Sequence, residues 1–252
     1  FPDRRGLATG LAIMGFGFAA LISSPIMNHL ILQYGISNTF YLLGAAYFIV
    51  IFCSAQYLAP PKDGWVPKGI QAAGQKSDRM KIKEDLRQLT ANEAVRTRQF
   101  WALWLMLFIN VTCGIAILSV ASPMAQELVG MTATGAATMV GIMGLFNGGG
   151  RIVWATISDY IGRPNVYTLF FAFQIVAFFM LPNITVGILF SIMVYIIMTC
   201  YGGGFSSIPA YIGDLFGTKQ LGAIHGYILT AWAAAGLAGP IFVSWVRETT
   251  GS

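Results

Sequence analysis

The feature that most restricts how this chain can fold is a set of long stretches without charge. Residues 6–61 contain no aspartate, glutamate, lysine or arginine. Over the whole chain 56% of the residues are hydrophobic and only 10% are charged, whereas soluble domains carry about 25% charged residues. A water-soluble globule is therefore disfavoured, and the lipid bilayer is the expected solvent.

Apolar runs of membrane-spanning length recur along the chain. A spanning helix needs about 20 mostly apolar residues, and charged, proline-containing or polar segments such as residues 33–39 separate the runs. The fold class predicted is therefore an all-α integral membrane protein. Its seven expected spans cover residues 8–31, 39–58, 99–121, 132–156, 166–182, 185–209 and 220–245.

Lysine and arginine residues set the predicted orientation, because short cytoplasmic loops accumulate them. If the chain starts inside, all basic residues except Arg151 and Arg247 fall on the cytoplasmic side. Residues 1–6 and 59–98 are therefore predicted to be cytoplasmic, and the protein to lie in the plasma membrane. Since this topology explains the net charge of +5, no nucleic-acid partner is expected.

An internal repeat indicates how the chain is organised. Two copies of a Phe, Gly, Gly and Pro pattern lie six predicted helices apart, as parallel six-helix halves would place them. The copies are Phe1, Gly6, Gly10 and Pro25, and Phe216, Gly222, Gly226 and Pro240. We expect three parts: residues 1–58 as the last two helices of one half, 59–98 as a cytoplasmic connector, and 99–252 as the first five helices of the other.

The end of this connector carries a helix-capping pattern. Thr90 and Glu93 lie three residues apart, before the apolar run that starts at Phe100. In such a capping box the two side chains accept hydrogen bonds from backbone N–H groups that otherwise lack partners at a helix start. A regulatory role for the charged connector is the alternative.

Arg151 is the most informative single residue. A guanidinium inside a span costs at least about 2.5–3.5 kcal/mol, so a cavity, a partner or an anionic ligand should compensate it. Snorkelling to the cytoplasmic surface is the alternative. Asn147 lies one turn earlier on the same face and is placed to orient the guanidinium or to touch a ligand. The glycines at 148–150 would allow a helix or a substrate to approach closely.

Two further groups are candidate functional residues. Tyr201 and Phe205 share a helix face in a segment weakened by glycines and a proline, which suits the wall of a ligand cavity; aromatic packing is the alternative. Asp159 and Arg163 flank Gly162, so that a carboxylate and a guanidinium can pair across a tight turn. Solvated loop charges would be the alternative there.

Several other chemistries find no support. The cysteines lack disulfide or zinc spacing, so no metal site is expected, and Gly15-Phe16-Gly17 resembles the start of a dinucleotide fingerprint without its βαβ context, so no cofactor is expected. No nucleophile, base and orienting residue converge, so the protein is predicted not to be an enzyme. No acidic residue lies within a predicted span, which leaves no embedded proton carrier.

Three segments carry a resemblance to a known family. They are Phe1-Pro-Asp-Arg-Arg-Gly-Leu-Ala-x-Gly10, Asn147-Gly-x-Gly-Arg151 followed by Ser158-Asp-x-x-Gly-Arg163, and Pro209-x-x-x-x-Asp214-x-Phe-Gly217. Together they resemble the oxalate/formate antiporter family of the major facilitator superfamily. The resemblance covers nearly the whole chain and implies that the spans are helices five to eleven of twelve, with the remaining helices of the same protein as partners.

The resemblance also implies a function and a site. It implies alternating access for small carboxylates in a lipid bilayer, with Arg151 as the carboxylate-binding arginine and Tyr201 and Phe205 at aromatic cavity positions. Trp232 stands where the oxalate transporter of the family has a lysine, which favours a monocarboxylate such as formate over oxalate. The residues expected to act in conformational gating are Asp159, Gly162, Arg163 and Asp214.

The leading hypothesis is thus a secondary active transporter of a small organic anion, with Arg151, Asn147, Tyr201, Phe205 and Trp232 as substrate-binding residues. One alternative is a facilitator or exporter of a neutral or amphipathic solute, in which Arg151 is purely structural. Another is a membrane sensor with the same fold that transports nothing and uses residues 59–98 as its partner surface.

Overall fold

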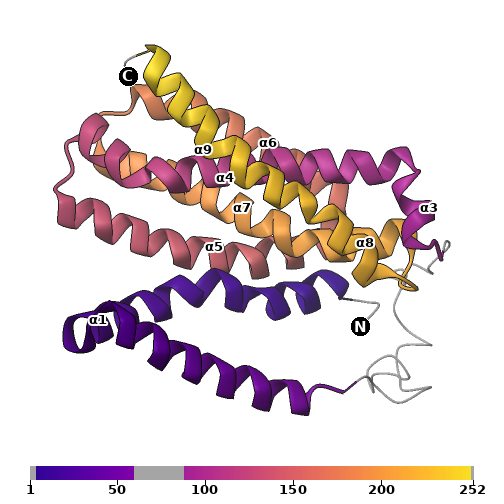
Figure 1. The fold of residues 1–252 in the computed structure, drawn as a ribbon. Coiled ribbons are helices and arrows are strands. Elements are labelled where there is room, and N and C mark those ends of the chain that lie inside the picture. The colour runs from indigo at the N-terminus through magenta and orange to yellow at the C-terminus, as the bar shows by residue number, and fades with distance from the viewer. Residues whose placement is uncertain (1–3, 60–87, 251–252) are drawn as a thin grey trace. The chain divides into compact units, whose positions relative to one another are not determined.

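The computed structural model describes residues 4–59 and 88–250, and every element within them is helical (Figure 1). The predicted all-α fold is confirmed for these residues, whereas most of the connector expected at 59–98 lies outside them. The elements are α1 (Arg5–Tyr57), α3 (Ala91–Val95), α4 (Arg98–Val129), α5 (Ala133–Ile161), α6 (Arg163–Met180), the 3₁₀ turn η1 (Leu181–Asn183), α7 (Gly187–Phe216), α8 (Leu221–Ile228) and α9 (Thr230–Thr250).

The number of membrane spans differs from the prediction. Among the described helices, five segments are long and apolar enough to cross a membrane: Pro25–Tyr57, Arg98–Val129, Arg163–Asn183, Gly187–Phe216 and Leu221–Thr249. The spans expected at 8–31 and 132–156 are not among them. From the first run, the described stretch Arg5–Ala19 is a shorter apolar helix, and the end of the run, from Pro25, belongs to a candidate span. The sequence of α5 contains threonines, glycines, an asparagine and two charged side chains, which lower its hydropathy.

A single residue interrupts α1. Gly35 has φ 76° and ψ 170°, so two helical segments meet there, and glycine alone adopts such a conformation without strain. This confirms the predicted division of the first two runs at residues 33–39.

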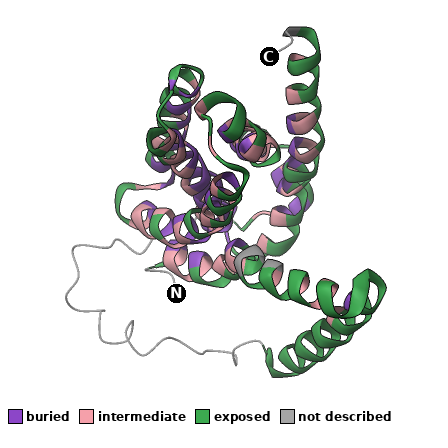
Figure 2. Ribbon diagram, turned by 90° about the vertical axis from the view of Figure 1, so that its left-hand side faces the viewer, coloured by how far each residue is buried: buried purple, intermediate pink, exposed green. Residues whose placement is uncertain are grey.

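The chain forms two units, which we describe separately. One unit contains Phe1–Phe18 and Ile82–Ser252, and the other contains Ala19–Lys81. In the second unit the described helix is apolar and almost entirely exposed (Figure 2). Apolar side chains such as Leu32, Phe40 and Ile51 are each more than 60% exposed, as expected for a segment whose solvent is not water.

Helix α7 lies at the centre of the first unit. It packs against α4, α5, α6 and α8, and α4 also packs along α9 (Figure 1). Its side chains Ile197 and Met198 are fully buried, together with Leu107 from α4, Phe170 from α6 and Ile224 from α8. The buried residues gather in these helices (Figure 2), so α7 is the scaffold on which the others are placed.

Glycines allow α5 to approach its neighbours closely. A Cβ atom on Gly150 would lie 2.5 Å from the carbonyl oxygen and 2.7 Å from the Cα atom of Thr199 in α7, and one on Gly148 would lie 2.6 Å from the Phe18 ring. At Gly149 no atom of another described residue lies within 4 Å. The predicted close approach of a helix is therefore confirmed for Gly148 and Gly150, whereas no described residue approaches Gly149.

The glycines of α7 have a role different from the expected one. The helix runs without interruption through Tyr201 to Pro209, so the segment is not broken. A Cβ on Gly203 would lie 2.7 Å from the Trp154 side chain and 2.8 Å from that of Phe170. These glycines therefore permit tight helix packing.

This packing predicts opposite outcomes for two adjacent alanine substitutions. Gly150→Ala should destabilise the protein by about 1–3 kcal/mol, because its methyl group would meet a backbone that cannot rotate away. Gly149→Ala should be neutral or slightly stabilising, because alanine is the better helix former and the space is open. Thermal unfolding of the two purified variants measures the difference, and an equal loss of stability would contradict the packing.

The predicted capping box is present and begins α3. The Thr90 backbone N–H donates to Oε2 of Glu93 (2.8 Å), and the Glu93 N–H donates to the Thr90 hydroxyl (3.4 Å). The hydrogen bonds from Thr90 to the carboxylate lower the pKa of Glu93, so it stays ionised. A second side chain, Thr97, caps the start of α4.

Candidate functional site

Arg151 is buried in the second half of α5 and is only 1% exposed. Its Nε donates a hydrogen bond to Oδ1 of Asn147 (3.1 Å), and Nη1 donates to the carbonyl oxygen of Ile13 (3.5 Å). The third nitrogen, Nη2, is buried and has no hydrogen-bond partner among the described residues. The side chain therefore does not snorkel to a surface, and it retains one charged donor without an acceptor.

Aromatic rings surround the guanidinium. Its Cζ atom lies 5.0 Å from the ring centroid of Phe16 and 5.3 Å from that of Phe205, which is the range of cation–π attraction. Phe205 meets Tyr201 and Trp232 edge to face, with centroids 5.5 Å and 5.6 Å apart, and Phe16 meets Trp232 at 5.9 Å. We call Phe16, Tyr201, Phe205 and Trp232 the aromatic cluster.

The structure thus brings together all five residues that the sequence indicated for the substrate site. Arg151 and Asn147 come from α5, Tyr201 and Phe205 from α7, and Trp232 from α9. Tyr201 and Phe205 are 5% and 8% exposed, whereas Trp232 is 38% exposed. Their roles in binding stay a prediction.

Phe16 was not predicted as a site residue. The sequence indicated it only as part of a rejected dinucleotide pattern, yet its ring covers Arg151. A Cβ on the next residue, Gly17, would lie 2.5 Å from the Cα atom of Gly148, so α1 and α5 touch by their backbones there. The sequence did contain a sign of this contact, because Gly17 and Gly148 each lie within a predicted span. It does not show, however, which spans pack against each other.

Hydroxyl groups form hydrogen bonds that connect α1, α5 and α7. The Thr9 side chain of α1 donates to the carbonyl oxygen of Ser206 in α7 (2.9 Å), and the Ser206 hydroxyl donates to the Arg151 carbonyl in α5 (2.8 Å). One of these bonds ends on the backbone of Arg151 itself. The two bonds hold the backbone that carries Arg151 in register with α7.

A second group of charges lies at the turn between α5 and α6. Nη2 of Arg163 pairs with Oδ1 of Asp159 (2.5 Å), and its Nε pairs with Oδ2 of Asp214 (3.3 Å) at the end of α7. Arg5 of α1 approaches Oδ1 of Asp214 (3.6 Å). Gly162, with φ 88°, makes the turn possible. The predicted pairing of Asp159 with Arg163 is confirmed.

The Asp159 carboxylate also holds the start of α1. Its two oxygens accept hydrogen bonds from the backbone N–H groups of Gly6 and Leu7, both at 2.9 Å. A carboxylate there is favoured by the unpaired N–H groups and the positive end of the helix dipole. We call Arg5, Asp159, Arg163 and Asp214 the charge network, because together they join α1, the α5–α6 turn and α7.

Burial predicts how strongly this network contributes to stability. Asp159→Asn should destabilise the protein by about 3–5 kcal/mol, because the buried Arg163 would lose the nearer of its two carboxylate partners and keep only Asp214. The matched control is Glu127→Gln, which breaks an ion pair with Arg247 whose side chains are 60% and 57% exposed and should cost about 0–1 kcal/mol. Thermal unfolding in detergent compares the two variants. Equal decreases in unfolding temperature would contradict a larger contribution from the buried network than from the exposed ion pair.

No group of histidine, cysteine, aspartate or glutamate residues in the described part of the chain is arranged to hold a metal ion. Cys53, Cys113 and Cys200 are free thiols.

Apolar helices of spanning length, packed around a buried arginine, define a multi-pass membrane protein. The model of the Major Facilitator Superfamily matches residues 1–240. The chain therefore belongs to the major facilitator superfamily, a family of membrane transporters rather than of enzymes.

The names of several relatives of this chain are those of transport proteins, which fits the family. The "Oxalate:formate antiporter" of Oxalobacter formigenes is 29% identical over 241 residues, which cover 95% of this chain and 54% of that protein. The "Apicoplast pyruvate carrier 1" of Toxoplasma gondii is 25% identical over 306 positions (100% and 55%). The "Monocarboxylate transporter 12" of Mus musculus is 25% identical over 280 positions (100% and 56%). The chain thus spans about half the length of these relatives, and the resemblance seen in its motifs is confirmed.

Proposed function

We propose that the protein containing this chain is a secondary active transporter that moves a small organic anion, a monocarboxylate such as formate, by alternating access. The observation that carries this proposal is the buried Nη2 of Arg151, a charged donor without an acceptor. Leaving such a donor unpaired costs about 1–3 kcal/mol or more. A carboxylate bound beside it would supply the missing acceptor in a charge-assisted hydrogen bond.

The composition of the site favours a single carboxylate. Phe16 and Phe205 of the aromatic cluster lie against one guanidinium, and Asn147 orients it through Nε. One guanidinium can neutralise one carboxylate, whereas oxalate would bring a second charge onto the Trp232 side of the cluster. Three relatives whose names refer to formate with oxalate, to pyruvate and to monocarboxylates support this class of substrate.

The charge network is suited to act as a gate in this mechanism. Its ion pairs and the two N–H bonds of Asp159 join α1 to α5, α6 and α7 at one end of these helices. Opening at that end would require these bonds to break, and closing would restore them. In this proposal residues 1–58 and 99–252 belong to two halves that move relative to each other, the connector at 59–98 is cytoplasmic, and the membrane is the plasma membrane.

Removing the Arg151 charge tests this function directly. In proteoliposomes that contain the full-length protein, Arg151→Gln should reduce formate uptake about a hundredfold, since a charge-assisted hydrogen bond contributes about 1.5–3 kcal/mol. Arg151→Lys should retain part of the uptake, because it keeps a cation. The control is Arg247→Gln, at an exposed ion pair, which should transport normally.

Three outcomes would oppose the proposal. Undiminished uptake in Arg151→Gln would make Arg151 structural and would favour a neutral solute. Formate binding without uptake by the unmodified protein would favour a sensor. Loss of a monodisperse profile in size-exclusion chromatography for both Arg151 variants would assign the arginine to folding.

We expect the residue at position 232 to determine whether the site prefers a substrate with one carboxylate or with two. Trp232→Lys would place a second cation beside Phe16 and Phe205, so oxalate should compete with formate about tenfold better than in the unmodified protein. Trp232→Gln removes the ring without adding a charge and should not improve oxalate competition. Equal oxalate competition in both variants would mean that position 232 does not face the substrate.

A further inference from the structure

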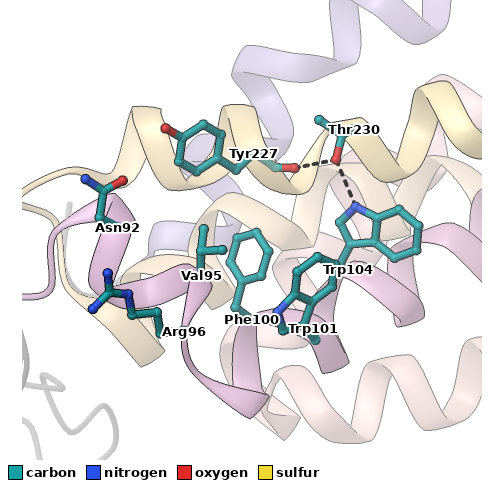
Figure 3. Close-up of a pocket in the computed structure, with 8 residues that line it drawn as sticks. All are labelled: Asn92, Val95, Arg96, Phe100, Trp101, Trp104, Tyr227 and Thr230. Atoms are coloured by element: carbon teal, nitrogen blue, oxygen red, sulfur yellow. Dashed lines mark hydrogen bonds between the residues drawn. The ribbon is translucent and has the colours of Figure 1, made fainter.

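A separate pocket of about 430 Å³ lies where α3, the start of α4 and the junction of α8 with α9 meet (Figure 3). It shares no residue with the aromatic cluster or the charge network. Asn92 and Arg96 lie at one end, Trp101, Trp104 and Thr230 lie at the other, and Val95, Phe100 and the Tyr227 ring lie between them (Figure 3). The lining residues are Asn92, Val95, Arg96, Phe100, Trp101, Trp104, Tyr227 and Thr230.

The polar end is held by hydrogen bonds to the last residue of α7 and to the N-cap residue of α8. The Leu89 N–H donates to the carbonyl oxygen of Phe216 (3.0 Å), and the Ala91 N–H donates to Oε1 of Gln220 (2.7 Å). Arg96 forms the C-cap of α3. The backbone that carries this cation is therefore fixed beside α8 although α3 itself is short.

Within the described part of the chain, Arg96 is offset only by a through-space attraction to Glu93 on the same helix, which also lies near Lys219. Its side chain is exposed and forms no ion pair among the described residues. The carboxylate of Glu93 on the same helix accepts hydrogen bonds from the backbone and the hydroxyl of Thr90. Arg96 points toward the Asn92 end of the pocket (Figure 3), so an anion there would meet a guanidinium and an amide together.

The other end presents apolar surface. The Trp104 indole N–H donates to the Thr230 hydroxyl (2.9 Å), which donates to the Tyr227 carbonyl (2.7 Å), as Figure 3 shows. The polar atom of this indole is thereby satisfied inside the protein. Trp101 and Tyr227 remain 55% and 46% exposed. Their rings are therefore available to an apolar ligand.

The position along the helix indicates the depth of the pocket in the bilayer. The candidate span begins at Arg98, so Trp101 and Trp104 lie within its first two turns. Tryptophan and tyrosine gather at this level, where headgroups meet acyl chains. A basic side chain just outside such a ring of aromatic residues is the arrangement that binds anionic headgroups between helices.

We propose that this pocket binds one phospholipid with an anionic headgroup. Arg96 pairs with the phosphate, Asn92 hydrogen-bonds the headgroup, and the upper part of an acyl chain lies on Trp101 and Tyr227. A soluble anion would not use the exposed rings, and a zwitterionic lipid would bring its own cation next to Arg96. The site requires only that α4 spans the membrane and does not depend on which solute is transported.

Native mass spectrometry of the full-length protein tests the proposal with two probes, phosphatidylglycerol and phosphatidylcholine of the same acyl chains. The unmodified protein should retain phosphatidylglycerol in preference to phosphatidylcholine. Arg96→Gln should lower this preference about tenfold, the effect of one charge-assisted hydrogen bond. The matched control is Arg98→Gln, which removes the same charge two residues away at a position that does not line the pocket and should leave the preference intact.

The results that would overturn the proposal are equally specific. Equal losses in the two variants would mean that the lipid responds only to general surface charge, and equal retention of both lipids by the unmodified protein would exclude a headgroup site. Quenching by phosphatidylglycerol with brominated chains provides a second readout, which should weaken in Trp101→Phe. Unchanged quenching in that variant would show that lipid does not reach Trp101, as when another protein segment covers the pocket.

Discussion

The burial of one guanidinium inside an apolar helix bundle is the constraint on which the rest of this structure depends. Placing an arginine there costs at least about 2.5–3.5 kcal/mol, and the fold offsets this through Asn147, the Ile13 carbonyl and the rings of Phe16 and Phe205. Those groups come from three helices, so they can reach Arg151 only if α1 and α7 lie close to α5. The same constraint therefore determines both the packing and the site.

Glycine provides this closeness. Gly148 and Gly150 allow α5 to pack closely against α1 and α7, and Gly17 allows the α1 backbone to contact Gly148. The charge network then fixes the ends of the same three helices, with Asp159 bonded to the first turn of α1 and Arg163 reaching Asp214 of α7. The close packing around the arginine and the ion pairs at the helix ends are the two features that the proposed alternating-access mechanism uses.

Much of this could be predicted from local sequence. The helices follow from apolar runs, the contact between Asn147 and Arg151 from their spacing of one turn, and the capping box at Thr90 from its motif. The pairing of Asp159 with Arg163 also follows from spacing. In each case the interacting groups lie within a few residues of each other, so backbone geometry alone brings them together.

The features that could not be predicted depend on contacts between distant segments. Phe16 covers Arg151 only because α1 packs on α5, and the glycines of α7 serve packing because Trp154 and Phe170 lie against them. The repeat illustrates the same limit: Gly6 and Gly10 pack closely against α5, whereas in the part of the chain that the structure describes no atom lies within 4 Å of a Cβ at their counterparts Gly222 and Gly226. The same sequence pattern therefore has different surroundings in its two copies.

The central claim is that Arg151 recognises the charge of a carboxylate. Equilibrium binding of formate and of formamide to the unmodified full-length protein tests it most directly, because the two ligands have similar size and differ in charge. Formate should bind at least about tenfold more tightly, since only the anion forms a charge-assisted hydrogen bond with the open Nη2. Equal affinities for the two ligands would contradict the account.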